Sequence, residues 1–187
     1  KKSLKIDPNQ PNALNNLGVV FLELNQPDEA LIRFDSAITF QTNYAEAYSN
    51  RGNALKDLNR PKDALESFDH AIAINPAYAK AHSNRGNVLK DLNLLNDALE
   101  SYDKAIYFMP NYANAHSNRG DALKELNQGE AAIKSYEQAI ILNPDIEFIL
   151  GELFKAKMSL CSWSGLADRI EEIKTKVKKK HFKETNQ

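Results

Sequence analysis

The feature that most constrains this chain is a sequence pattern that returns every 34 residues. The segment Asn-Arg-Gly-Asn at 50–53 returns at 84–87 and, with Asp in the last place, at 118–121. Self-similarity at such a period is the signature of a supersecondary unit that buries its apolar surface only by stacking on its neighbours. Four complete repeats are expected, and they cover residues 11–44, 45–78, 79–112 and 113–146.

Each repeat is predicted to contain two amphipathic helices. In the second repeat the apolar spacing indicates a first helix from Ala45 to Leu58 and a turn at Asn59-Arg60. Pro61 then suits the first turn of a second helix, because that position needs no backbone N–H donor. Asn75-Pro76 ends this helix near residue 74. The chain is therefore predicted to be all-α, a solenoid of antiparallel helix pairs.

Small residues recur where the two helices of a repeat must approach closely. Glycines stand in the first helices, at Gly18, Gly52, Gly86 and Gly120. We expect these glycines to face alanines in the second helices, namely Ala30, Ala64, Ala98 and Ala132. The aromatic residues Phe34, Phe68, Tyr102 and Tyr136 are expected to fill the seam toward the next repeat.

Gly, Ala, an aromatic residue, Ala and Pro at these spacings resemble the tetratricopeptide repeat from Pro11 to about Ile146. The resemblance implies a right-handed superhelix that binds a polypeptide on its concave side, which the first helices line. Two departures carry structural expectations. Thr42 replaces the terminal Pro of the first repeat, which predicts that the preceding helix runs on. Arginines at 51, 85 and 119 replace a residue such as Leu17, so their charged ends must reach water or an acidic partner.

The two ends of the chain differ from the repeats. Residues 1–10 align with the end of a second helix, which predicts a remnant of a preceding repeat and at least one further repeat upstream. After residue 146 the repeat register is expected to be lost, because Phe154 stands in the place of the repeated glycine. Helical spacing nevertheless continues on both sides of residues 161–164. Residues 147–187 are therefore predicted to form a helical hairpin that caps the stack or joins it to a further domain.

A narrower resemblance begins near the end of the last helix. Residues 153–158, Cys161-Ser162-Trp163 and the helix after Ser164 resemble the junction that follows the last repeat in SPINDLY-type proteins, which are similar to O-linked N-acetylglucosamine transferase. Ser162 stands where that family has Asp. The resemblance implies that the repeats form an arm that recruits acceptor proteins. It also implies that a nucleotide-sugar domain follows Gln187.

The candidate binding residues lie on the first helices, on the side turned away from the second helices. An asparagine side chain offers donors and acceptors, so a row of them can pair with the backbone of an extended peptide whatever its side chains. The predicted peptide-binding amides and their neighbour are Asn16, Asn50, Asn53, Asn84, Asn87, Asn118 and Asp121. Three lysines accompany this row, at Lys56, Lys90 and Lys124, where they bind a ligand or simply keep the surface solvated.

Composition and motifs indicate which other functions are not expected. Lys plus Arg (24) and Asp plus Glu (25) nearly cancel, so no overall field favours nucleic acid. The single Cys161 and the absence of metal-ligand spacing fit a reducing, cytoplasmic location with neither disulfide nor metal. His82 and His116 occupy the place of Tyr48 and are expected to be hydrogen-bonded core residues. No catalytic set, cofactor motif or membrane segment is expected.

The sequence therefore predicts a module that binds a protein or peptide and has no catalytic site. The leading hypothesis is the substrate-recruiting arm of an enzyme similar to O-linked N-acetylglucosamine transferase. A free-standing adaptor is one alternative, and a self-association module of an enzyme is another.

Overall fold

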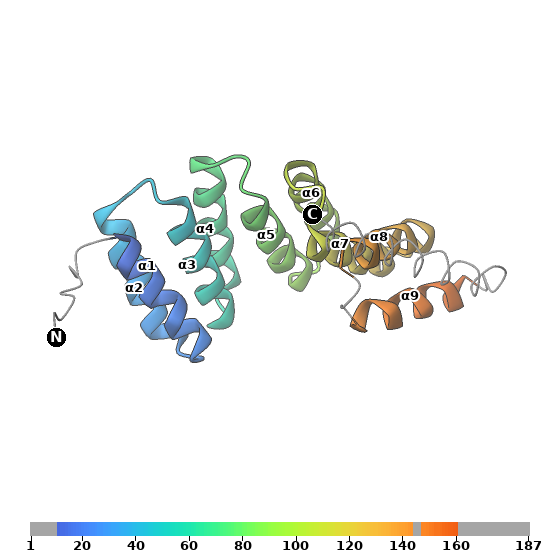
Figure 1. The fold of residues 1–187 in the computed structure, drawn as a ribbon, viewed down its shortest axis with the longest axis horizontal. Helices are drawn as coiled ribbons and strands as arrows, with labels where there is room; N and C mark the ends of the chain where they lie inside the picture. Colours follow the sequence, from blue (N-terminus) through green and yellow to red (C-terminus); the bar gives the residue numbers. More distant parts are fainter. Residues whose placement is uncertain (1–10, 144–146, 161–187) are drawn as a thin grey trace, which may run out of the picture. The chain divides into compact units, whose positions relative to one another are not determined.

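The computed structural model describes residues 11–143 and 147–160. These residues form helices joined by short turns, without a strand, which confirms the predicted all-α class (Figure 1). The helices are α1 (Pro11–Glu23), α2 (Pro27–Phe40), α3 (Ala45–Asp57), α4 (Pro61–Ile74), α5 (Ala79–Asp91), α6 (Leu95–Phe108), α7 (Ala113–Glu125), α8 (Gly129–Leu142) and α9 (Glu147–Ser159). The predicted remnant at 1–10 and the segment from Cys161 to Gln187 lie outside the described residues.

The chain divides into two compact units. Unit 1 spans Lys1–Leu94 and carries α1 to α5, and unit 2 spans Leu95–Gln187 and carries α6 to α9. In unit 1, α1 packs on α2 and α3 on α4, while α2 also packs on α3 and α4 on α5. The first helices of successive repeats, α1, α3 and α5, contact each other as well. In unit 2, α7 packs on α6 and on α8, and α8 packs on α9.

The turn between the two helices of each repeat has a left-handed residue, and that residue is always asparagine. In the second repeat Asn59 has a φ of 56°. Its N–H donates to the carbonyl of Lys56, and the N–H of Arg60 donates to the carbonyl of Leu55. These two bonds form a Schellman motif, which satisfies carbonyls that the helix end leaves free. The predicted turn at Asn59-Arg60 is confirmed, and Pro61 occupies the predicted first turn of α4.

The expectation that α2 would run on without a terminal Pro is wrong. Helix α2 ends at Phe40, and Gln41 takes an extended conformation while its N–H donates to Ala37. Asn75 closes α4 in the same way, with a bond to Ala71. The helix therefore ends at the same repeat position with Thr42 as with Pro76, so the proline is not required for this helix end.

The repeated glycines face aromatic rings, which corrects the expectation that they face alanines. A Cβ atom added to Gly52 would lie 2.7 Å from two ring carbons of Phe68, and one added to Gly18 would lie 2.5 Å from the ring of Phe34. Gly120 meets the ring of Tyr136 in the same way, at 2.6 Å. Each glycine thus makes room for the aromatic residue of its own repeat. The alanines are themselves fully buried, at Ala30, Ala64, Ala98 and Ala132.

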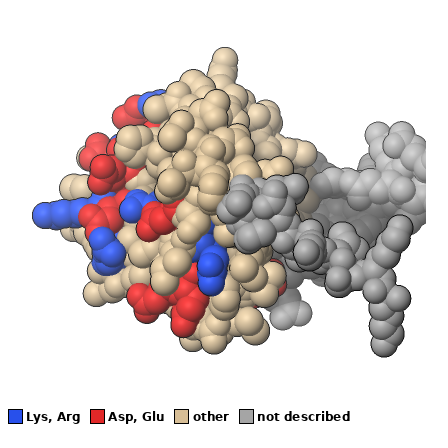
Figure 2. Space-filling model, turned by 90° about the vertical axis from the view of Figure 1, so that its left-hand side faces the viewer, with Lys and Arg blue, Asp and Glu red and all other residues tan. Residues whose placement is uncertain are grey.

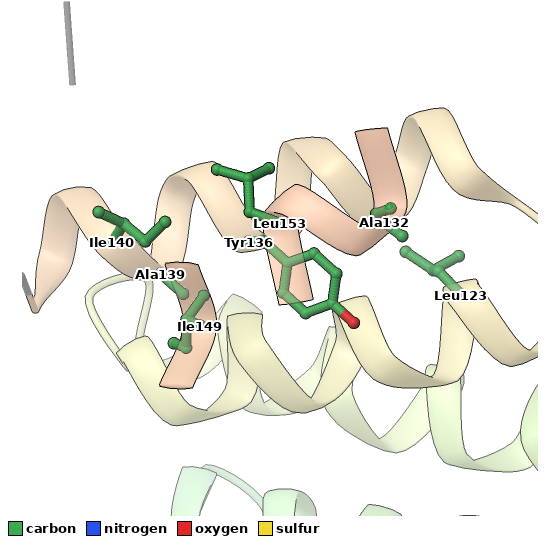
Figure 3. Close-up of a cluster of buried hydrophobic side chains, with 8 residues drawn as sticks. Leu123, Ala132, Tyr136, Ala139, Ile140, Ile149 and Leu153 are labelled. Carbon is green, nitrogen blue, oxygen red and sulfur yellow. The ribbon is translucent and has the colours of Figure 1, made fainter. Parts of the chain in front are cut away.

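Helix α9 continues the packing of the repeats, although its residues have lost the signature. Ile149 and Leu153 of α9 are buried beside Tyr136, which also contacts Leu123 of α7 in the same apolar cluster (Figure 3). Ile149 stands exactly one repeat length after the buried Ala115 of α7. The expected loss of register after residue 146 is therefore wrong for packing. It is correct for composition, because Phe154 has replaced the glycine and is 37% exposed.

The repeated arginines join the second helix of one repeat to the first helix of the next. In unit 1, Arg51 of α3 donates from Nε to Asp35 of α2 at 2.6 Å and from Nη1 to Ser67 of α4 at 2.7 Å. The same Arg–Asp pair recurs with Arg85 and Asp69 in unit 1, and with Arg119 and Asp103 in unit 2. The sequence left two alternatives for these guanidinium groups, water or an acidic partner, and the structure shows an aspartate partner for each. Because the aspartates are more than half exposed, each pair contributes only about 0–1 kcal/mol.

Candidate functional site

The predicted binding residues lie on one face of the first helices, which we call the rung face. In unit 1 it comprises Asn16 on α1, Asn50, Asn53 and Lys56 on α3, and Asn84, Asn87 and Lys90 on α5. In unit 2 it comprises Asn118, Asp121 and Lys124 on α7. Asn16 and Lys56 are exposed and the others are half-buried. Spacings of three residues place the members of each set on neighbouring turns of one helix face.

In unit 1 the rung amides of adjacent first helices are hydrogen-bonded to each other. Asn84 of α5 donates from Nδ2 to Oδ1 of Asn53 on α3, at 3.0 Å. Asn50 of α3 donates from Nδ2 to Oδ1 of Asn15 on α1, at 2.9 Å. The structure thus brings Asn53 and Asn84 together as neighbours. Asn16, which the repeat spacing selected on α1, takes no part in this contact.

Asn15 is the residue that sequence reasoning missed. It is completely buried, and it accepts the bond from Asn50 because Val19, which stands in the repeat position of Asn53, has no acceptor. Its repeat position holds Ser49 and Ser83 in the next two repeats. The sequence did contain a signal for this contact: Asn15 carries an amide at a repeat position where the next two repeats have serine.

Asn50→Ala and Asn84→Ala are expected to lower the stability of the chain by different amounts. Asn50→Ala leaves the buried Oδ1 of Asn15 without its donor, and an unsatisfied buried acceptor costs about 1–3 kcal/mol. Asn84→Ala leaves Oδ1 of the half-buried Asn53 within reach of water, so the loss is only about 0.5–1 kcal/mol. Urea unfolding of the two variants measures both costs. Equal destabilisation would contradict the burial of Asn15.

In unit 2 the rung face makes different contacts. Asp121 accepts a hydrogen bond from the hydroxyl of the buried Tyr136, at 2.8 Å. Burial, reinforced by this bond, raises the pKa of Tyr136 far above its usual value. Lys124 forms an ion pair with Glu152 of α9, and Lys155 donates to the other carboxylate oxygen of Glu152 at 2.8 Å.

Glu152 holds the position that an asparagine holds in the other repeats. It stands one repeat length after Asn118, and its side chain is only 7% exposed. The hydrogen bond from Lys124, and then that from Lys155, lower its pKa below the usual value. The carboxylate therefore stays charged at neutral pH and binds the ammonium groups of Lys124, on the rung face of unit 2, and of Lys155 on α9.

The histidines have structural contacts. His82 is buried, and its Nε2 donates to the carbonyl of Pro76 at 2.9 Å; His116 makes the equivalent bond at 3.0 Å to the carbonyl of Pro110. These bonds confirm the prediction of hydrogen-bonded histidines, with His116 less deeply buried. His70 stacks on Tyr48, with ring centroids 5.2 Å apart, a contact that the repeat spacing did not predict.

The described part of the chain presents neither a metal centre nor a membrane span. Over residues 11–143 and 147–160, His, Cys, Asp and Glu side chains do not gather into a group that could hold a metal ion. None of the described helices combines the length and the apolar character that crossing a bilayer requires.

Figure 2 looks at the side of unit 1 that carries α1 and α2. Acidic and basic side chains lie interspersed on one part of that face, beside a larger area of uncharged residues.

Models of the tetratricopeptide repeat match this chain in three forms. One matches residues 45–78 and 113–146, a second, described as a TPR repeat, matches 86–127, and a third matches 1–32. The chain belongs to the tetratricopeptide-repeat family. Among curated proteins, none matches the sequence.

Solved structures agree with this assignment. A crystal structure of MamA is similar at a TM-score of 0.67 and 28% identity, over 75% of this chain and 82% of that one. MamA from Desulfovibrio magneticus RS-1 is similar in fold at a TM-score of 0.73 and 21% identity, over 93% and 97%. The first TPR domain of human RPAP3 is similar in fold at 0.62 and 24%, over 66% and 97%. The chain is therefore an all-α tetratricopeptide-repeat solenoid, and this fold serves as a protein-interaction module.

Proposed function

We propose that this tetratricopeptide-repeat chain binds an extended segment of another polypeptide along its rung face. The observation that carries the proposal is the pairing of Asn84 with Asn53 across two first helices. The bond holds both amides in fixed positions, so a ligand does not have to order them on binding. It uses one of the two N–H groups of Asn84, and each amide oxygen has two lone pairs. The remaining donors and acceptors match those of a peptide backbone.

Affinity in this arrangement comes from several weak contacts. A hydrogen bond between neutral groups contributes about 0.5–1.5 kcal/mol net, so one rung alone gives little binding. An extended peptide advances about 3.3 Å per residue and therefore meets successive helices at intervals of a few residues. Backbone recognition of this kind tolerates many side-chain sequences.

Asn53→Ala combined with Asn84→Ala, both on the rung face of unit 1, is expected to weaken a bound peptide about 5- to 150-fold, because each change removes about 0.5–1.5 kcal/mol of contact. The ligand is a peptide selected on the purified protein from a displayed random library, and calorimetry measures its affinity. Asn50 is left intact because it supports the buried Asn15.

The matched control is Asn43→Ala with Asn96→Ala, which removes two exposed asparagines outside the rung face. This variant is expected to bind like the parent, and thermal melts check that both variants are folded. Unchanged affinity in the rung variant, with its fold intact, would show that the peptide binds on another surface.

Two contexts for this activity have separate support. The match to MamA spans 82% of that chain, which favours a module built wholly of repeats. The segment Cys161-Ser162-Trp163, which lies outside the described residues, favours an arm attached to a glycosyltransferase. The coding sequence after Gln187 distinguishes them: a nucleotide-sugar domain supports the arm and a stop codon supports the adaptor. Self-association is tested by sedimentation of the purified chain.

A further inference from the structure

We propose that the rung face of unit 1 selects acidic side chains, so that the bound polypeptide is an extended segment carrying Asp or Glu. The inference rests on the proposed function and adds a ligand chemistry to it. Its origin is an internal contact of unit 2, where the carboxylate of Glu152 lies between the ammonium groups of Lys124 and Lys155.

The repeat register identifies the positions of unit 1 that are equivalent to this ion pair. Lys56 of α3 stands two repeats before Lys124, and Asn84 of α5 stands two repeats before Glu152. Where unit 2 provides a carboxylate for its rung lysine, unit 1 therefore provides only a neutral amide. Asn84 turns to Asn53 at 3.0 Å, and Lys56 has no ion pair among the residues that the structure describes. An acceptor for Lys56 must then come from a ligand or from water.

The rung positions around Lys56 favour an anionic ligand. The rung positions of α3 and α5 hold four asparagines and two lysines, whereas the equivalent positions of unit 2 include the carboxylates of Asp121 and Glu152. A ligand carboxylate can accept one bond from the ammonium group of Lys56 and another from the second N–H of Asn84. Hydrogen bonds to an ionised acceptor are about twice as strong as neutral ones. In an extended peptide, alternate residues point to the same side, so acidic residues two apart face the rung surface together.

The test uses two synthetic peptides of about 12 residues, long enough to extend over about 40 Å. In one peptide every second residue is Glu, and in the other every Glu is replaced by Gln; both have blocked ends, so that only side-chain carboxylates differ. At low salt the Glu peptide is expected to bind the parent chain at least about 5-fold more tightly, and this preference shrinks as salt rises. The protein's net charge of −1 provides no general attraction for an acidic peptide.

Lys56→Gln is expected to weaken the Glu peptide about 2- to 5-fold, as for one exposed ion pair, and to leave the Gln peptide unchanged. Lys62→Gln is the matched control, because it removes the same charge from an exposed position on α4. It should change neither affinity.

Three outcomes overturn the inference. If the Glu and Gln peptides bind equally and Asn84→Ala weakens both, backbone recognition stands and carboxylate selection fails. If neither peptide binds while a library-selected peptide does, selection for acidic side chains is again refuted. If Lys62→Gln weakens the Glu peptide as much as Lys56→Gln does, the preference is a general charge effect and has no site at the rung face.

Discussion

Phe68→Ala is expected to lower the free energy of unfolding by about 3–5 kcal/mol, among the largest effects of any single change in unit 1. The ring is completely buried and packs in one cluster with Leu55, Ala64 and Val88. Its removal leaves a cavity that neighbouring helices cannot fill without moving apart from their other partners. Urea or thermal unfolding monitored by circular dichroism measures the loss.

The effect of Gly52→Ala on stability is expected to change sign when the ring of Phe68 is removed. In the parent chain, Gly52→Ala destabilises by about 1–3 kcal/mol, since its Cβ would lie 2.7 Å from carbons of the Phe68 ring. In the Phe68→Ala background the ring is absent, so the same methyl group fills part of the cavity and the alanine favours the helix by about 0.5–1 kcal/mol. Gly52→Ala should then be neutral or stabilising.

Gly151 is the control for these glycine substitutions. It lies within α9, and a Cβ atom added there meets nothing within 4 Å. Gly151→Ala is therefore expected to stabilise by about 0.5–1 kcal/mol. A destabilising effect of equal size at Gly52 in both backgrounds would mean that the ring of Phe68 does not limit this position.

Lys157→Ala is expected to destabilise unit 2 by up to about 3–5 kcal/mol, because it removes the ammonium group that pairs with a buried carboxylate. Lys157 of α9 lies 3.1 Å from Glu137 of α8, and each side chain is only 10% exposed. Lys155→Ala is the comparison in the same helix. Its side chain is 70% exposed, so losing its ion pair with Glu152 should cost about 0–1 kcal/mol.

Replacing both members of the buried pair separates the charge from the packing. Glu137→Leu together with Lys157→Leu removes both charges and keeps apolar volume, and such exchanges are often neutral or stabilising by about 1–4 kcal/mol. We expect the double variant to recover most of the loss seen with Lys157→Ala alone. If Lys157→Ala and Lys155→Ala cost the same, the pair is not buried in solution.

The repeat period was sufficient to predict the backbone of this protein. The effects of Asn59, Pro61 and Pro76 reach only a few residues along the chain, so a local pattern was enough to place the ends of these helices, although it misplaced the end of α2. Arg51 was also interpretable, because an arginine in an apolar repeat position needs an acceptor, and Asp35 supplies it. Because these residues recur at the same repeat positions, their structural roles could be predicted from the sequence.

The contacts that escaped prediction are those in which one repeat differs from the others. Asn15 pairs with Asn50 only because Val19 cannot accept a hydrogen bond, and Glu152 binds Lys124 only because α9 has changed its rung residue. The orientation of the glycines was also missed, because spacing along each helix does not say which of two neighbouring side chains on the partner helix lies opposite. Peptide binding at the rung face stays a prediction, which the affinity measurements on the rung variant test.

The Arg–Asp pairs have a consequence for how such a chain changes length in evolution. Each pair joins an arginine to an aspartate 16 residues earlier, as with Arg51 and Asp35 and again with Arg85 and Asp69. The aspartate recurs in the first three repeats and the arginine in the last three. Tandem duplication or deletion of one repeat-long segment therefore recreates a complete pair at the new junction. At residue 153 the arginine position holds leucine, and Glu137 turns to Lys157 instead. Internal repeats are consequently interchangeable by unequal recombination, whereas α9 is compatible only with the repeat that it now covers.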